Sequence, residues 1–213
     1  MRNAANKGAQ GGFTLVELMV VITIAAILGA VIMPNMRNFL RNSRLSSGVN
    51  DLLHSLNLAR SEAVKRQANA GVALNVVVCG STSPTAANPA CTYNTFSGWF
   101  VFVDLNNNWQ HDNGEPVLEA HAPLDASVTV KTDANNDIVS YSPTGFSNLP
   151  AGAAAVIPTN TIVLCDARQV TAVGAQSTAR ALFISPTGRA RSSNLYADIV
   201  ANALPNIVGK ACP

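Results

Sequence analysis

The sequence GGFTLVELMVVITIAAILGAVIM, residues 11–33, determines the fold of the N-terminal part of the chain. Within it, the 21 residues from Phe13 to Met33 carry a single charged side chain, that of Glu17. At about 1.5 Å per residue, a helix of this length spans roughly 30 Å, the thickness of the hydrocarbon core of a bilayer. The stretch therefore predicts a transmembrane helix over residues 13–33.

The residues around this stretch favour a retained anchor. Arg2 and Lys7 precede it without any acid, which keeps the N-terminus on the cytoplasmic side. An ordinary secretory signal peptide is the alternative, but its apolar region would be shorter, and no clear A-x-A cleavage site follows. A carboxylate near the bilayer interior costs roughly 3 kcal/mol. No Lys or Arg lies within two helical turns of Glu17, so its partner must come from elsewhere, and a new amino terminus would serve.

The longer stretch GGFTLVELMVVITIAAILGAVIMPNM resembles the class III signal of type IV pilins and type II secretion pseudopilins. The resemblance implies that a prepilin peptidase cuts after Gly12, that Phe13 is N-methylated, and that Glu17 pairs with the amine of a neighbouring subunit. The implied partners are other major and minor pilin or pseudopilin subunits and an inner-membrane assembly platform. The implied location is the bacterial inner membrane, with one membrane pass, a periplasmic C-terminal domain, and extraction into a pilus or pseudopilus.

The residues after the anchor predict a second helical segment. Pro34 cannot supply a helical N–H, so we expect a helix kink or local melting near residues 30–34. A helical pattern then resumes to about Arg66, with one apolar stripe that should dock on a globular domain. The stripe has 4-3-4-3-4 spacing and consists of Leu45, Val49, Leu52, Leu56, Ala59 and Ala63.

Beyond residue 67 the pattern changes to short runs of β-branched and aromatic residues separated by Asn, Gly and Pro, as in antiparallel sheets. A long N-terminal helix packed on such a sheet is an α+β fold. We therefore expect a leader at 1–12, a transmembrane helix at 13–33, an amphipathic helix at 34–66 and a β-rich domain at 67–213. The expected strands contain AGVALNVVV, GWFVFVD, SVTVKT, DIVSYS, TIVLC and ARALFIS.

Two stretches that follow the anchor, NLARSEAVKRQ (57–67) and GWFVFVDLNNNWQHDNGEPVL (98–118), resemble the GspH/FimT branch of minor pilins and pseudopilins. The resemblance implies a structural minor pilin of a type IV pilus. The equivalent pseudopilin of a type II protein secretion system is the alternative. The two share anchor, fold and mechanism, so the sequence leaves both open.

Four cysteines follow the apolar run, which indicates an oxidising compartment and two disulfides. Three pairings are possible. Sequence proximity favours Cys79 with Cys91 and Cys165 with Cys212. A zinc site is the competing interpretation, but no C-x-x-C pair or nearby histidine supports it.

Residues 100–118 contain a weak match to a calcium loop. The matching residues, at template positions 1, 3, 5 and 12, are Asp104, Asn106, Asn108 and Glu115. Trp109 replaces the expected glycine and the flanks read as strands, so a plain turn is the favoured interpretation. No arrangement of nucleophile, base and carboxylate is recognisable. We expect no enzyme activity, no cofactor and no resident metal.

The net charge of +2 comes from Arg2 and Lys7, because the remaining 12 basic and 12 acidic residues balance. Binding to a polyanion therefore needs a local patch. The stretch SPTGRARSS, 185–193, resembles the Gly-Arg-x-Arg-x-Ser element of FimT-type minor pilins that bind DNA during natural transformation. The residues assigned to the match are Gly188, Arg189, Arg191 and Ser192, with Ser193 as a spare hydroxyl.

Two arginines that lie two apart on a β run project from one face and could grip successive phosphates. The similar turn SPTGFSN, 142–148, lacks arginine, so the turn itself does not require these charges. The predicted DNA binding is weak, sequence-independent and sensitive to salt. Surface solubility is the alternative reason for the two arginines.

Overall fold

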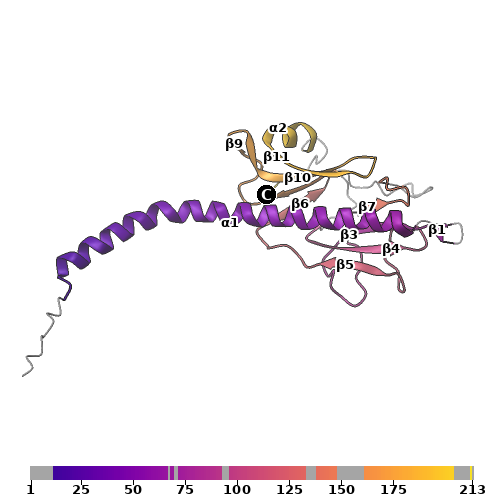
Figure 1. Cartoon of the computed structure of the whole chain (residues 1–213), viewed down its shortest axis with the longest axis horizontal. Helices are drawn as coiled ribbons and strands as arrows, with labels where there is room; N and C mark the ends of the chain where they lie inside the picture. Colours follow the sequence, from indigo (N-terminus) through magenta and orange to yellow (C-terminus); the bar gives the residue numbers. More distant parts are fainter. Residues whose placement is uncertain are drawn as a thin grey trace, which may run out of the picture. The chain divides into compact units, whose positions relative to one another are not determined.

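The computed structural model describes residues 12–66, 68–69, 72–92, 96–132, 138–147, 161–203 and Cys212 (Figure 1). Of the expected leader, residues 1–11 lie outside the described residues. The chain divides into two compact units, residues 1–41 and 42–213, and each is considered by itself.

One helix, α1 (Leu15–Arg66), contains both the predicted transmembrane segment and the predicted amphipathic segment. By length and composition it can cross a membrane. Its large apolar side chains between Leu15 and Leu40 are exposed to an extent of roughly half or more. A continuous apolar surface of this kind is unfavourable in water and marks contact with lipid or with another protein.

Pro34 lies inside α1, which continues through residues 30–34 without interruption. The local melting expected there is therefore wrong, and the expected kink stays a prediction. A proline removes one N–H donor from a helix but leaves the other hydrogen bonds of the turn possible. The side-chain amide of Asn35 adds one more, to the Val31 carbonyl oxygen at 3.3 Å.

The second unit contains two antiparallel sheets, which confirms the α+β prediction. The first has strand order β5-β4-β3-β7 and the second β11-β10-β8-β6, with β9 paired to β10; a separate hairpin joins β1 and β2. The strands are β1 (Ala68–Asn69), β2 (Val72–Ala73), β3 (Asn75–Ser81), β4 (Gly98–Asp104), β5 (Val117–His121), β6 (Thr129–Thr132), β7 (Ile138–Tyr141), β8 (Thr161–Cys165), β9 (Ala172–Val173), β10 (Gln176–Ile184) and β11 (Ala190–Leu195). A short helix α2 (Tyr196–Asp198) and a π-helical turn η1 (Ile199–Ala203) follow.

The apolar stripe of α1 is buried against both sheets, as predicted. Its six side chains are at most 3 % exposed, and they share one hydrophobic cluster with residues of the two sheets, among them Val101 and Leu182. Within this cluster the indole N–H of Trp99 donates to the Ser55 hydroxyl at 2.8 Å. This bond satisfies a buried donor and ties α1 to β4.

The opposite face of the first sheet has a hydrophobic cluster of its own, which we call the outer cluster. It contains Val77, Phe100 and Phe102 from β3 and β4, and Trp109 from the loop that follows β4. Because both faces are covered, every residue of β3 and β4 is buried. This explains why these strands read as continuous apolar runs rather than alternating ones.

Candidate functional site

The N-terminal junction lies at the start of α1, where Phe13 is 83 % exposed and Glu17 occupies the first helical turn. The Thr14 hydroxyl oxygen accepts a hydrogen bond from the Glu17 backbone N–H at 3.2 Å. Thr-x-x-Glu is a known pattern for the start of a helix, and a carboxylate in the first turn also complements the helix dipole. The T-x-x-E spacing of Thr14 and Glu17 is the sequence signal of this cap, and no expectation above included it. Glu17 therefore has a local role in starting α1, in addition to any role in assembly.

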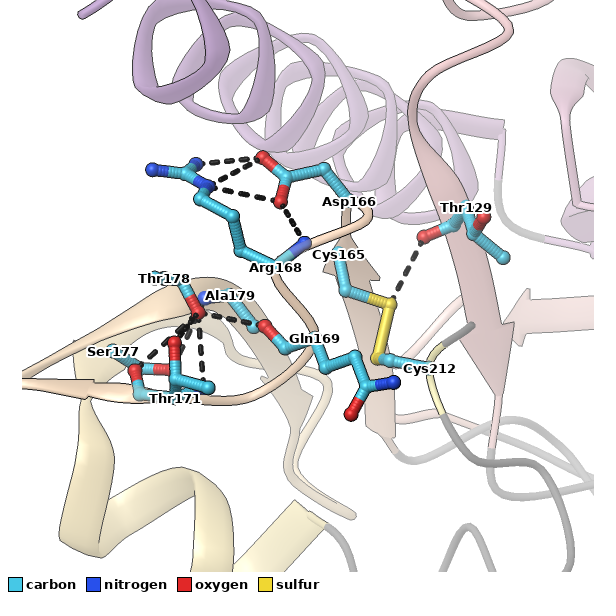
Figure 2. Close-up of a disulfide and its surroundings, with 10 residues drawn as sticks. All are labelled: Thr129, Cys165, Asp166, Arg168, Gln169, Thr171, Ser177, Thr178, Ala179 and Cys212. Carbon is cyan, nitrogen blue, oxygen red and sulfur yellow. Dashed lines mark hydrogen bonds and ion pairs between the residues drawn. A yellow bond between two sulfur atoms is a disulfide. The ribbon is translucent and has the colours of Figure 1, made fainter. Parts of the chain in front are cut away.

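Two disulfides are present, Cys79–Cys91 and Cys165–Cys212, which is the pairing that sequence proximity favours. Their Cα–Cα distances are 5.6 and 6.1 Å, within the usual range. Figure 2 shows the second disulfide, in which the Sγ atom of Cys165 lies 3.6 Å from the Thr129 carbonyl oxygen. This disulfide attaches the end of the chain to β8, next to the neighbouring strand β6.

A strong ion pair lies beside this disulfide, directly after β8 (Figure 2). The Arg168 guanidinium approaches the Asp166 carboxylate at 2.6 Å, and it also donates to the Asn42 side chain of α1 at 2.9 Å. Asp166 is 3 % exposed. The pair therefore gives a buried carboxylate its counter-charge and connects the loop after β8 to the helix.

The residues of the calcium-loop match fold into a hydrogen-bonded turn. The Asp104 carboxylate accepts the backbone N–H groups of Asn108 and Trp109 at 3.2 and 2.9 Å. The Glu115 carboxylate accepts those of Leu105 and Asp112 at 2.8 and 3.0 Å. Within the described residues, no group of three or more acidic, histidine or cysteine side chains is arranged to hold a metal.

The fold of this turn has a clear structural consequence. Trp109 stands where the template has glycine and adopts a positive φ of 64°, which few non-glycine residues tolerate. With this backbone conformation, the Trp109 side chain covers the outer cluster of the first sheet and is 1 % exposed. Burial is the main reason that the pKa of Asp104 is raised, although the Trp109 N–H partly offsets it. The turn thus serves to bring Trp109 over the sheet.

Two of the predicted DNA-binding residues, Arg189 and Arg191, line one groove of about 500 Å³ beside β10 and β11. Arg189 is exposed, and its side chain makes no hydrogen bond or ion pair with any residue that the structure describes. Arg191 is engaged in two contacts instead. It pairs with the Asp198 carboxylate at 2.8 Å and lies 4.3 Å from the centre of the Phe183 ring. The pair with Arg191 is the main reason that the pKa of Asp198 falls to about 2.

The serine of the predicted element lies apart from the arginines. Ser192 pairs with Leu182 of β10, whereas Arg191 pairs with Phe183, so their side chains belong to opposite faces of the sheet. The assignment of Ser192 to the element is also wrong by one residue. Counted from Gly188, the order Gly-Arg-x-Arg-x-Ser ends at Ser193. The structure thus brings Arg189 and Arg191 together but not Ser192, whereas Ser193, two residues after Arg191 on β11, shares the face of Arg191.

The two SPTG stretches form matching turns that lie against each other. In the first, the Gly145 N–H donates to the Ser142 carbonyl at 2.8 Å, and in the second, the Gly188 N–H donates to the Ser185 carbonyl at the same distance. Each glycine has a φ of 78°. The Ser147 N–H of the first turn donates to the Pro186 carbonyl of the second at 3.2 Å. We refer to residues 142–147 and 185–189 as the twin turns.

Arg60 of α1 fastens the twin turns to the helix. Its Nε donates to the Gly145 carbonyl at 3.0 Å and its Nη2 donates to the Thr187 carbonyl at 3.0 Å. One guanidinium therefore bridges three segments that are far apart in the sequence. The repeated SPTG sequence indicated two similar turns, but no sequence pattern indicated that one arginine joins them.

Comparison with known proteins agrees with this architecture. Residues 48–192 match the family described as type II transport protein GspH, and residues 7–33 match the prokaryotic N-terminal methylation motif. The chain is also 30% identical over 182 residues to the pilin-like protein PilA1 of Thermus thermophilus, an alignment that covers 84% of this chain and 96% of the relative. No solved structure matches.

These matches span both the apolar start of α1 and most of the two-sheet unit. The GspH match includes the buried stripe of α1 from Val49 onward, the loop that carries Trp109 and the twin turns, whereas the methylation motif includes Gly12, Phe13 and Glu17. The chain therefore belongs to the GspH family, a group of minor pilins and pseudopilins related to type IV pilins.

Proposed function

We propose that this chain is a structural, non-enzymatic minor subunit of a type IV pilus or a pilus-like fibre. Prepilin peptidase cuts after Gly12, Phe13 becomes the methylated N-terminus, and Glu17 pairs with the amine of a neighbouring subunit. Before assembly the protein resides in the inner membrane with the two-sheet unit in the periplasm, where disulfides form. An assembly platform in that membrane moves it into the fibre together with other subunits.

The observation that carries this proposal is the exposed apolar first half of α1, which begins next to the Gly12–Phe13 junction and contains one acid. Lipid can cover such a surface before assembly and apolar helices of other subunits can cover it afterwards. An acid within it is stable only with a partner. A neighbouring amine supplies that partner only in the assembled state, so Glu17 sets the position of one subunit against the next.

The test is the incorporation of a Glu17→Ala variant into fibres in the native host, with Glu62→Ala on the same helix as the matched control. We expect both variants in the membrane fraction, but only the control and the parent in sheared fibres. The intact mass of the parent should correspond to a chain that begins at a methylated Phe13. Normal amounts of Glu17→Ala in fibres, or a mature chain that begins elsewhere, would refute the proposal.

The alternative assignment is a pseudopilin of a type II secretion system, which uses the same anchor and assembly. Deletion of the gene separates the two. Loss of surface pili with normal secretion supports the pilus subunit, whereas loss of secreted enzymes with normal pili supports the pseudopilin.

A second candidate function is DNA binding at the groove of Arg189 and Arg191, and Arg189 favours it, because its exposed side chain has no partner among the described residues. The ion pair with Asp198 leaves Arg191 less available to phosphate. Arg189→Gln should therefore weaken binding of duplex DNA at low salt more than Arg191→Gln does. Asp198→Asn should strengthen binding, because it frees Arg191 and removes a negative charge. Equal binding by all three variants and the parent would exclude a DNA-uptake role for this groove.

A further inference from the structure

A second pocket lies beside β11 and shares no lining residue with the arginine groove. Its volume is about 270 Å³, and its lining comes from α1 and from the neighbouring strands β10 and β11. The lining residues are Ser46, Val49, Asn50, Arg180, Ser192, Ser193 and Asn194. With the single exception of Val49, every lining residue is polar.

Arg180 is the one charged residue of this lining. Its Nη1 donates to the carbonyl oxygens of Ser177 and Ala179 at 2.9 and 3.0 Å, which fixes the guanidinium in place. The remaining donors, Nε and Nη2, have no hydrogen-bond partner among the described residues, and no described carboxylate forms an ion pair with Arg180. A fixed, half-buried guanidinium without an acid is uncommon in a protein, because burial of an unpaired charge is costly.

The electrostatic surroundings of Arg180 favour an anion. Its pKa is lowered chiefly by burial and further by the positive charge of Arg168. Arg168 has its own carboxylate, Asp166, at 2.6 Å, whereas Arg180 has none within the described part of the chain. An anion in the pocket would supply the missing counter-charge.

The neutral residues of the pocket supply additional donors from two sides. Ser46 and Asn50 lie one turn apart on α1, and Ser192 and Asn194 alternate along β11, so each pair belongs to one face. Their side chains make no hydrogen bond with another described residue. Two hydroxyls and two amides around a guanidinium fit a tetrahedral oxyanion better than a planar carboxylate, because donors can reach several oxygens.

We propose that the pocket of Ser46, Asn50, Arg180, Ser192 and Asn194 binds a phosphate group. This site is separate from the arginine groove and does not depend on DNA binding there. The group comes either from free phosphate or from a phosphodiester, as in a lipid headgroup or a nucleic-acid backbone.

The test uses the full chain in micelles of a neutral detergent, titrated with inorganic phosphate at constant ionic strength and followed by thermal melting. Phosphate should raise the Tm of the parent, since a ligand that binds only the folded state stabilises it. The Arg180→Gln variant should lose at least about tenfold in affinity for phosphate. Arg189→Gln carries the same loss of charge in the other groove and should bind phosphate as the parent does.

A double variant, Ser192→Ala with Asn194→Ala, removes two uncharged donors from a surface strand and keeps the test valid if Arg180→Gln does not fold. It should weaken phosphate binding several-fold. No effect of phosphate on the parent, equal affinity in the parent and both pocket variants, or an equal loss in Arg189→Gln would overturn the proposal. Dimethyl phosphate distinguishes the source: competition by this diester indicates a phosphodiester ligand, and its failure to compete with inorganic phosphate indicates free phosphate.

Discussion

Gly188 lies against the carbonyl oxygen of Gly145, so closely that a β-carbon on Gly188 would overlap that oxygen. The contact joins the twin turns at their centre. Both residues have a positive φ, so glycine is required in each turn for its backbone conformation and at Gly188 also for space.

Gly188→Ala should therefore destabilise the protein more than a glycine-to-alanine substitution at a positive φ where the added methyl group meets no other atom. Gly174→Ala is the matched control, because Gly174 has a φ of 64° and open space around it. The control should lose about 1–2 kcal/mol in free energy of unfolding. Gly188→Ala should lose roughly 2 kcal/mol more, because backbone must move to admit the methyl group. Chemical denaturation measures both, and equal losses would show that the turns can separate at no cost.

Arg60→Ala should destabilise the protein by about 2–3 kcal/mol, because it leaves two carbonyl oxygens of the twin turns without their charged donor. Lys65→Ala on the same helix is the control. Lys65 pairs with Glu62 at 3.0 Å but its side chain is 68% exposed, so its loss should cost less than about 1 kcal/mol. Denaturation by urea, followed by circular dichroism, gives the comparison. A cost for Arg60→Ala as small as that of the control would contradict the bridging role.

Replacing each disulfide by two alanines should destabilise the protein to a different extent. Cys79 and Cys91 are 12 residues apart and Cys165 and Cys212 are 47 apart. If the crosslinks act mainly on the unfolded chain, their removal should cost about 3 and about 4 kcal/mol respectively. Unfolding curves of the two double variants check the order. A larger loss for the short crosslink would mean that its packing in the outer cluster dominates.

The ion pair of Arg191 with Asp198 should stabilise the protein in a pH-dependent way. The pKa of Asp198 is lowered in the folded state from 3.8 to about 2, so this contribution is complete above pH 4 and is lost as the pH falls toward 2. Half of the Arg191 side chain is exposed, so we expect less than about 1 kcal/mol at neutral pH. The difference in Tm between the parent and Asp198→Asn should shrink between pH 5 and pH 2.5. A difference that stays constant over this range would show that the pair adds nothing.

The helix α1 and several strands could be predicted from the sequence, because the spacing of apolar residues within each segment is enough to identify them. The spacing of Leu45, Val49 and Leu52 identifies the buried face of α1 without any knowledge of what covers it. The runs TIVLC and GWFVFVD identify strands for the same reason. By contrast, the edge strand β5 was not predicted, since VLEAH is short, has no fully buried residue and is held by backbone bonds to β4.

Side-chain contacts between segments that are distant in the sequence could not be predicted from sequence patterns. Arg191 looked available for DNA, but the chain turns back after β11 and places Asp198 beside it. Arg60 belongs to no sequence pattern, because its two partners come from loops 85 and 127 residues away. In both cases the residue types were visible in the sequence but the pairing was set by the tertiary fold.

The separation of the two tryptophans has a spectroscopic consequence. Trp99 lies in the cluster under α1 and stacks on His121 with ring centres 4.0 Å apart, while Trp109 lies in the cluster on the other face of the same sheet. The chain has no third tryptophan. Replacing either one by phenylalanine leaves a single tryptophan as fluorophore. In Trp109→Phe the emission of Trp99 follows undocking of the helix, and in Trp99→Phe the emission of Trp109 follows opening of the loop after β4. Fluorescence can thus establish whether the two faces of the sheet unfold together or in sequence.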